Sequence, residues 1–361
     1  TIKGVNFMKF ENLWTPVTVG NMKLKNRLVM APMTRSRANN DGTVDSHSAL
    51  YYSQRATMGL IISEGTQPSL EGQGYLKSPG IYTDAHIEAW KKVSDAVHSK
   101  GSHFFIQLMH AGRMNHPDNT SDHHQGVAPS AIVPENGHMF TSKGMKPIPM
   151  PREMTLNDIS RTIDDFRNAA KSAIKAGADG VEIHGANGYL IHEFLGANSN
   201  LRKDQYGGSI ENRTRFAVEV AKAVSNEIGP NRVGFRISPY AGFSTIDEGL
   251  DGLALYSSLT EQLNKLGLAY LHVLHTGRED ILASVREKWD NKLIVNRMGR
   301  PLEDIDKDLN NGTADLVSVA TWALSNPDLV KRLQQGLPLN DGDHKTFFGG
   351  GDHGYIDYPT I

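Results

Sequence analysis

The sequence predicts a single α/β domain, a (β/α)8 TIM barrel. Eight short apolar segments alternate with eight segments of helical periodicity along the 361 residues. The apolar segments show no alternation of polar and apolar residues, as expected for parallel strands covered on both faces. A doubly wound sheet, the alternative, needs fewer strands for this length and a Gly-x-Gly-x-x-Gly after its first strand; neither is seen. We therefore expect one barrel domain over residues 1–361.

Each predicted element rests on a local pattern. The strands are short apolar runs at residues 27–32, 59–65, 103–110, 181–183, 232–238, 270–274, 293–295 and 316–319. The helices carry apolar residues at spacings of three and four at residues 46–58, 87–97, 159–174, 210–228, 253–266, 281–289, 302–309 and from 326 onward. Thr155-Leu156-Asn157-Asp158 matches a capping box, and Gly177 lies where a helix end favours glycine. Pro327 is expected at the first position of the last helix.

Residues 111–152, after the third strand, follow neither pattern. Pro, Gly, His and Ser are frequent there, and no period holds for long. Long insertions in compact proteins are often lids or binding elements, so we expect this segment to act as a lid. The pair His123-His124 is a weak metal candidate, because no carboxylate or third histidine falls at ligand spacing. We therefore expect no metal site. The glycine run 349–351 has no helix after it and is expected to be a loop.

Composition limits the class of protein. The chain is 39% hydrophobic and 22% charged, which is typical of a soluble globular protein. Lys plus Arg total 38 against 40 Asp plus Glu, so neither nucleic acid nor a membrane surface is an expected partner. Residues 1–6 lack the order of a signal peptide. The absence of cysteine excludes disulfides, thiolate nucleophiles and Fe–S clusters and fits a cytoplasmic protein, which we expect to be a monomer or homodimer.

Polar groups follow the predicted strands at the ends where barrel enzymes place their sites. The polar groups are Thr34, Gln107, the set His184, Asn187 and Tyr189, and Arg236, and one further strand end carries a glycine, Gly65. The set contains no paired carboxylates, no metal ligands, no strand-end lysine and no serine nucleophile elbow. Neutral hydrogen-bond donors and one cation instead suit a bound cofactor that carries the difficult chemical step. The alternative interpretation is structural: His184 and Asn187 cap backbone groups, and Tyr189 packs.

Five segments together resemble the Old Yellow Enzyme family. They are residues 26–38, 107–113, 184–195, 204–213 and 354–359. The resemblance covers essentially the whole chain in order, and the segment 204–213 is highly specific. It implies an FMN-dependent ene-reductase, an oxidoreductase that uses NADPH or NADH to reduce activated C=C bonds by ping-pong hydride transfer. Dienoyl-CoA reductase relatives are excluded, because they need further domains and a cysteine-bound cluster.

The resemblance also implies roles for individual residues. Tyr189 protonates the α-carbon of the alkene, while His184 and Asn187 bind the carbonyl or nitro oxygen. Thr34 bonds a flavin carbonyl, Gln107 holds the pyrimidine edge, and Arg236 lies at the flavin N1 side. The full set implied for noncovalent FMN binding is Pro32, Met33, Thr34, Gly65, Gln107, Arg236, Met298, Gly299, Arg300, Ala320 and Thr321. The set implied for the substrate pocket is Tyr75, Met109 and Phe348.

The chain departs from the family pattern at three places. Met109 replaces a frequent Trp, Phe348 a frequent Tyr, and Ala320-Thr321 the usual Gly-Arg after the eighth strand. Thr321 offers one neutral hydroxyl where an arginine would hold the FMN phosphate, so we expect weaker FMN binding, partly offset by Arg297 or Arg300. The sequence does not identify the physiological alkene or the preferred nicotinamide. A flavin-binding barrel without catalysis is the competing hypothesis.

Overall fold

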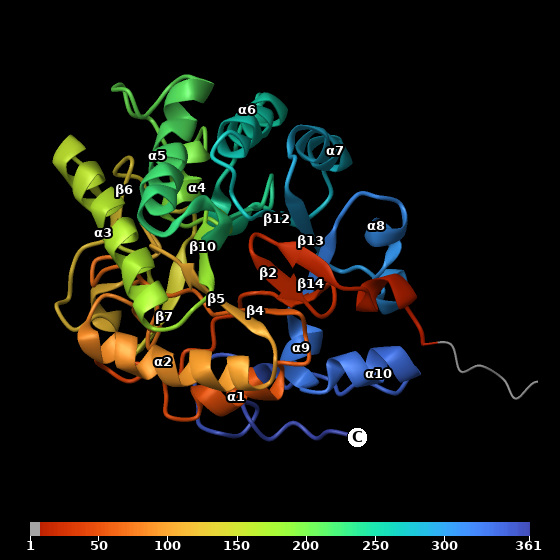
Figure 1. The fold of residues 1–361 in the computed structure, drawn as a ribbon. Coiled ribbons are helices and arrows are strands. Elements are labelled where there is room, and N and C mark those ends of the chain that lie inside the picture. The colour runs from red at the N-terminus through yellow and green to blue at the C-terminus, as the bar shows by residue number, and fades with distance from the viewer. Residues whose placement is uncertain (1–7) are drawn as a thin grey trace, which may run out of the picture.

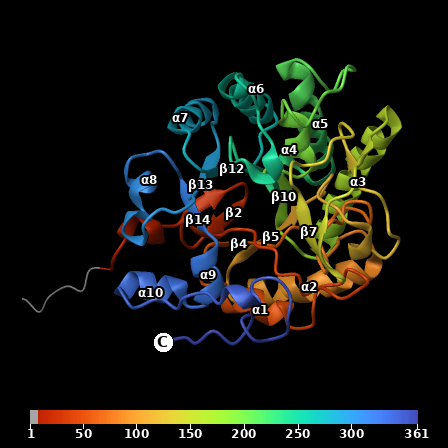
Figure 2. The ribbon, with the colours of Figure 1, turned by 180° about the vertical axis from the view of Figure 1, so that it is seen from behind.

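The predicted barrel is confirmed. The computed structural model describes residues 8–361, so the expectation for residues 1–6 lies outside the described part of the chain. Eight parallel strands close in the order β10-β11-β12-β13-β14-β3-β4-β5, with helices arranged around them (Figures 1 and 2). These strands are β3 (Leu28–Met30), β4 (Leu60–Ile62), β5 (His103–Leu108), β10 (Gly180–His184), β11 (Val233–Ile237), β12 (Tyr270–His275), β13 (Lys292–Arg297) and β14 (Leu316–Val319).

The helices follow the predicted order with shorter bounds in places. They are α1 (Ser48–Gln54), α2 (Asp84–Ser99), α3 (Leu156–Lys175), α4 (Leu190–Leu195), α5 (Ile210–Ile228), α6 (Gly252–Asn264), α7 (Glu279–Lys288), α8 (Lys307–Asn310), α9 (Thr321–Ser325) and α10 (Leu329–Gln335). The capping box is present at α3: Asp158 N–H donates to Thr155 Oγ1 at 3.0 Å, and Thr155 N–H donates to Asp158 Oδ2 at 2.8 Å. Gly177 follows α3 with φ of +85°, as expected for a residue after a helix end.

The prediction for the last helix was wrong in detail. The helix predicted from residue 326 begins only at Leu329, as α10, so Pro327 lies in the turn before it, and a short helix that was not predicted, α9, precedes that turn. The side chain of Asn326 fixes that turn, because it donates to Trp322 O at 3.0 Å and accepts from Asn340 N–H at 2.7 Å. A side chain that satisfies backbone groups in this way competes with helix formation. Similarly, the segment 302–309 divides into a 3-10 turn, Leu302–Asp304, and α8.

A short hairpin that the sequence did not reveal closes the amino end of the barrel. Its strands are β1 (Val17–Val19) and β2 (Met22–Leu24), whose inward side chains are buried. They belong to one apolar cluster with interior residues of the barrel such as Phe105 and Tyr270. Because this end is filled, the carboxyl ends of the strands remain as the place for a site.

The insertion after β5 contains structure of its own. Strands β7 (His138–Thr141) and β8 (Gly144–Pro147) form an antiparallel hairpin, and the two-residue strands β6 (Val127–Ala128) and β9 (Arg152–Glu153) pair in parallel. The hairpin therefore stands at the carboxyl side of the barrel, on the segment that connects β5 to α3. In residues 8–361, no helix is long and apolar enough to cross a membrane.

The capping box yields a stability prediction. Replacing Thr155 with Ala removes the acceptor for Asp158 N–H at the start of α3 and should lower the free energy of unfolding by about 1 kcal/mol. Urea denaturation of the two proteins measures this difference. Thr360→Ala is the control, since Thr360 is an exposed threonine near the chain end. Equal stability of the Thr155→Ala and Thr360→Ala proteins would contradict a stabilising role for the cap.

Candidate active site

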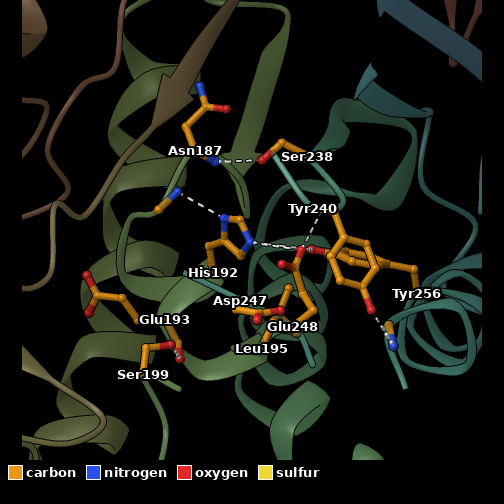
Figure 3. Close-up of polar contacts among 12 residues, drawn as sticks. Asn187, His192, Glu193, Leu195, Ser199, Ser238, Tyr240, Asp247, Glu248 and Tyr256 are labelled. Carbon is orange, nitrogen blue, oxygen red and sulfur yellow. Dashed lines mark hydrogen bonds and ion pairs between the residues drawn. The ribbon is translucent and has the colours of Figure 1, made fainter. Parts of the chain in front are cut away.

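The three predicted catalytic residues lie at the end of β10, where His184 is the last strand residue, and in the turn from β10 to α4, which carries Asn187 and Tyr189. Asn187 and Gly188 both have positive φ, +60° and +82°. Their backbone N–H groups are held by side chains: Asn187 donates to Ser238 Oγ at 2.8 Å, and Gly188 donates to His192 Nδ1 at 2.9 Å (Figure 3). A Cβ on Gly188 would lie 2.6 Å from Phe243 O, so this position requires glycine. The turn is therefore fixed on both sides.

The structure brings the three residues together. The rings of His184 and Tyr189 meet edge to face with centroids 5.2 Å apart, and Tyr189 Oη donates to Tyr75 Oη at 3.0 Å. His184 Nδ1 and Asn187 Oδ1 are buried without a hydrogen-bond partner in the described chain, and so is Nε of the nearby Arg236. Buried polar atoms are normally satisfied. Three unsatisfied atoms around one turn indicate that a polar ligand binds here.

Two cavities open on either side of this turn. One, of about 580 Å³, reaches from Asn187 and Arg236 to the ends of β13 and β14. It is lined by seven residues of the predicted cofactor set: Pro32, Arg236, Met298, Gly299, Arg300, Ala320 and Thr321. The other, of about 710 Å³, is lined by Thr34, Tyr75, Tyr189 and Phe348. Their arrangement suits a polar cofactor in the first cavity and an organic substrate in the second.

The remaining predicted residues line neither cavity. Met33 is half-buried, and Gly65 packs against Met109 so closely that a Cβ on Gly65 would lie 2.5 Å from the Met109 sulfur. Met109 is thus buried beside β4 and does not reach the wall of the larger cavity. Gln107 and His184 are buried inside the barrel end. The prediction that Met109 shapes the substrate pocket remains untested by this geometry.

A buried carboxylate that sequence reasoning missed lies beneath the site. Glu182 accepts hydrogen bonds from Gln107 Nε2 at 2.9 Å, Tyr270 Oη at 2.8 Å and His272 Nδ1 at 2.8 Å. Burial raises its pKa, but His272, Arg236 and the hydrogen bonds outweigh burial and bring the pKa down to about 2. Glu182 is therefore ionised. Glu182 lies two residues before His184 on β10, and alternate residues of a strand face the same side. This spacing could have indicated that both face the barrel interior.

The two predicted catalytic rings are neutral at physiological pH. Burial, together with the positive charge of Arg236, lowers the pKa of His184 to about 3. Arg236 acts directly, because it pairs with His184 in the register of β10 and β11. Burial also raises the pKa of the Tyr189 phenol well above its ordinary value, with a further contribution from Tyr75. The site therefore presents uncharged donors beside one arginine.

The arginines near Thr321 already have carboxylate partners. Arg297 donates to Asp308 from Nε at 2.6 Å and from Nη2 at 2.9 Å, and it also contacts Glu279. Arg300 Nη1 donates to the same Asp308 at 3.0 Å. Asp308 is only 4% exposed at its side chain and lines the 580 Å³ cavity. Positive charge at this end of the cavity is thus balanced by two carboxylates.

Distant segments complete the larger cavity. The insertion contributes Met114 and the hairpin residues Met139, Phe140 and Met145. The C-terminal segment contributes Phe348, and two arginines just after β3 fix it: Arg35 Nη2 donates to Gly354 O at 2.6 Å, and Arg37 Nη2 donates to Thr346 O at 2.7 Å. Burial alternates along residues 138–141, but His138-Met139-Phe140-Thr141 has no matching alternation of polar and apolar residues, so no local sequence pattern indicated this wall. No group of three or more metal-ligand side chains occurs within residues 8–361.

Comparisons with known proteins agree with this geometry. Residues 12–340 match the model of the NADH:flavin oxidoreductase / NADH oxidase family. A 12-oxophytodienoate reductase 1 from Oryza sativa subsp. japonica is 43% identical, over 97% of this chain and 93% of the relative. A probable flavin mononucleotide-dependent alkene reductase from Leishmania infantum is 42% identical, over 96% of each.

Solved structures extend the agreement to three dimensions. Morphinone reductase in complex with tetrahydroNAD superposes with a TM-score of 0.93 at 40% identity, covering 97% of this chain and 98% of the other. An old yellow enzyme homologue from Zymomonas mobilis gives a TM-score of 0.93 at 36% identity, covering 97% and 100%. Noncovalent FMN with NAD(P)H as electron donor follows from these relationships. The chain belongs to the NADH:flavin oxidoreductase family and is an FMN-dependent, Old Yellow Enzyme-type oxidoreductase.

Proposed function

We propose that this enzyme reduces the C=C bond of α,β-unsaturated carbonyl compounds, and of nitroalkenes, with His184, Asn187 and Tyr189 as the catalytic residues. The observation that carries the proposal is their meeting at one turn between the two cavities. When bound, FMN would supply the redox chemistry, which is hydride transfer from NAD(P)H to the β-carbon of the alkene. The protein supplies binding, polarisation and the proton.

His184 and Asn187 bind the substrate oxygen. Negative charge develops on that oxygen as a hydride adds to the β-carbon, and preorganised neutral donors stabilise such charge in a buried site. The neutral His184 imidazole has an N–H to donate and the Asn187 side chain an NH2 group, while His184 Nδ1 and Asn187 Oδ1 have no hydrogen-bond partner in the described chain. We assign this pair as the oxyanion site: Asn187 lines the 580 Å³ cavity, and the ring of His184 contacts Tyr189, which lines the 710 Å³ cavity.

Tyr189 delivers the proton to the α-carbon as a general acid. Tyr189 lines the substrate cavity, and its hydroxyl donates to Tyr75 Oη at 3.0 Å. The residues that line the rest of this cavity, including Met114, Met139 and Phe140, are largely apolar, so we expect hydrophobic alkenes as substrates. Methionine side chains adapt their shape, which favours a range of β-substituents.

The residues of the 580 Å³ cavity fit FMN. Arg236 would lie near the flavin ring with its unsatisfied Nε, and the loops after β13 and β14 would hold the phosphate, as in other barrels. The competing hypothesis is a flavin-binding barrel without turnover. Anaerobic addition of NADPH followed by cyclohexenone decides between them. Bleaching of the flavin and then recolouring means turnover, whereas bleaching that cyclohexenone does not reverse would contradict the proposal.

The role of Tyr189 predicts a separation of the two half-reactions. Tyr189→Phe should slow alkene reduction by roughly 10²–10⁴-fold, the usual effect of losing a general acid. Reduction of the flavin by NADPH should keep its rate, because no proton is required from Tyr189 in that step. Stopped-flow absorbance measures both rates. Tyr206→Phe is the control, since Tyr206 bonds Glu219 outside the site. Equal slowing of both half-reactions would assign Tyr189 to packing.

The pKa shifts predict a flat pH profile. His184 keeps its neutral form as pH falls through 6.5, its ordinary pKa, because its pKa in the folded protein is about 3. Tyr189 keeps its proton as pH rises through 10. The rate of alkene reduction should therefore vary little between about pH 5 and about pH 9, measured with a neutral enone. An acid limb near pH 6.5 that disappears in His184→Asn would show that His184 titrates in this range and would contradict the prediction.

The phosphate end of the cofactor cavity predicts weak FMN binding that can be improved. Asp308→Asn removes a carboxylate that pairs with Arg297 and Arg300 and should tighten FMN, because both arginines gain freedom to meet the phosphate. Thr321→Arg should tighten FMN by roughly 10–150-fold, the equivalent of one charge-assisted hydrogen bond. Arg300→Ala should loosen it.

Quenching of flavin fluorescence on titration of apoprotein with FMN gives these dissociation constants. Asp306→Asn is the matched control, since it removes one charge two residues from Asp308 on a side chain that caps no backbone group. If Asp306→Asn tightens FMN as much as Asp308→Asn, net charge and not the freed arginines is responsible. If none of the variants changes the dissociation constant, the phosphate is held elsewhere.

A further inference from the structure

The side chains behind the catalytic turn form a buried chain of polar contacts (Figure 3). His192, on α4, accepts from Gly188 N–H through Nδ1 at 2.9 Å. Its other ring nitrogen, Nε2, lies 3.2 Å from Glu248 Oε2. Glu248 also accepts from Tyr240 N–H at 2.8 Å and from the hydroxyl of Tyr256 on α6. His192 and Glu248 are fully buried, and neither contacts a cavity.

These contacts determine the tautomer of His192. A backbone N–H can only donate, so Nδ1 must carry the lone pair that accepts from Gly188. The ring proton is then on Nε2, which faces the Glu248 carboxylate and donates to it. If the ring proton moved to Nδ1, two donors would face each other at Gly188. Glu248 thus stabilises the one form of His192 that can hold the turn, the relationship that carboxylates have with histidine in many active sites.

We infer that His192 and Glu248 are positioning residues for the reaction: through Gly188 they set the orientation of Asn187 and Tyr189. This inference rests on the proposed function. Asn187 and Gly188 are consecutive residues of positive φ, which for Asn187 is a conformation maintained by its surroundings. Ser238 holds the first N–H and His192 the second. With either acceptor removed, a buried N–H loses its partner and the turn can relax.

The position of the supporting residues explains why the effect is specific to the site. Ser238, Tyr240 and Glu248 all lie on the segment between β11 and α6, directly beside the turn after β10. The segment after β11 therefore supports the catalytic turn that follows the neighbouring strand, β10. Displacement of reacting groups by about 1 Å can cost roughly 10²-fold in rate, so small relaxation of this turn should be measurable.

Two substitutions of His192 separate positioning from packing. His192→Leu fills a similar volume but cannot accept from Gly188 N–H. His192→Asn places a carbonyl oxygen near the position of Nδ1 and keeps that acceptor, although it does not reach Glu248. In FMN-saturated protein, His192→Leu should weaken phenol binding and slow alkene reduction by roughly 10–100-fold. His192→Asn should recover most of both. Phenol is the probe because its oxygen imitates the substrate oxygen, and its binding is read from the flavin spectrum.

Two further variants and a control complete the test. Ser238→Ala and Glu248→Leu should also weaken phenol binding. Ser238→Ala removes the acceptor for Asn187 N–H, and Glu248→Leu removes the carboxylate that fixes the tautomer of His192. Asn26→Leu is the matched control. Asn26 is a buried side chain that accepts two backbone N–H groups, from Leu28 at 3.1 Å and Gly59 at 2.8 Å, but at the amino end of the barrel. It should lower the melting temperature and leave phenol affinity unchanged.

Unchanged phenol affinity in His192→Leu or Glu248→Leu would overturn the inference. Equal loss in His192→Leu and His192→Asn would overturn it as well, because the acceptor would then not matter. So would a loss in Asn26→Leu as large as in His192→Leu, which would indicate general destabilisation. If the unsubstituted enzyme binds phenol but does not turn over cyclohexenone, the proposed function fails, and the phenol affinities of the variants still decide whether His192 and Glu248 position the turn.

Discussion

One buried carboxylate, Glu182, sets the electrostatics on which the site depends. It lies inside the barrel, where an isolated charge is costly, and it is stabilised by side chains from β5 and β12. Tyr270 reaches it across β11 because its ring lies over Gly234, where any Cβ would collide with the ring. The negative charge of Glu182 in turn balances Arg236 and allows that guanidinium to remain buried at the site.

This arrangement combines two buried charges with neutral rings. Glu182 is ionised and Arg236 is the nearby cation, while His184, which pairs with Arg236 in register, and Tyr189 are neutral. The single cation suits a cofactor that becomes anionic on reduction, while the neutral donors suit a substrate that gains charge only during the reaction. A protonated His184 would be repelled by Arg236 and would bind anions indiscriminately. Burial prevents this.

The two ends of the 580 Å³ cavity differ in whether their polar groups have partners within the protein. Beside His184, Asn187 and Arg236, buried polar atoms have no partner in the described chain, and a polar ligand would satisfy them. Near Thr321, the arginines are paired internally through Asp308. The affinity of the enzyme for FMN is therefore expected to come mainly from the ring, and exchange of the cofactor is favoured by a phosphate site that is already neutralised.

The sequence by itself determined the barrel, because eight apolar segments alternate with segments of helical periodicity, a pattern typical of this architecture. It also predicted the polar groups that follow the strands, and helix α5 agrees with its predicted bounds. Tertiary structure alone decided the rest. Glu182 and Tyr270, Arg35 and Gly354, or His192 and Glu248 are far apart in sequence, and no periodicity shows which polar side chains meet. Those pairings depend on strand register and loop path, which are set by packing of the whole barrel.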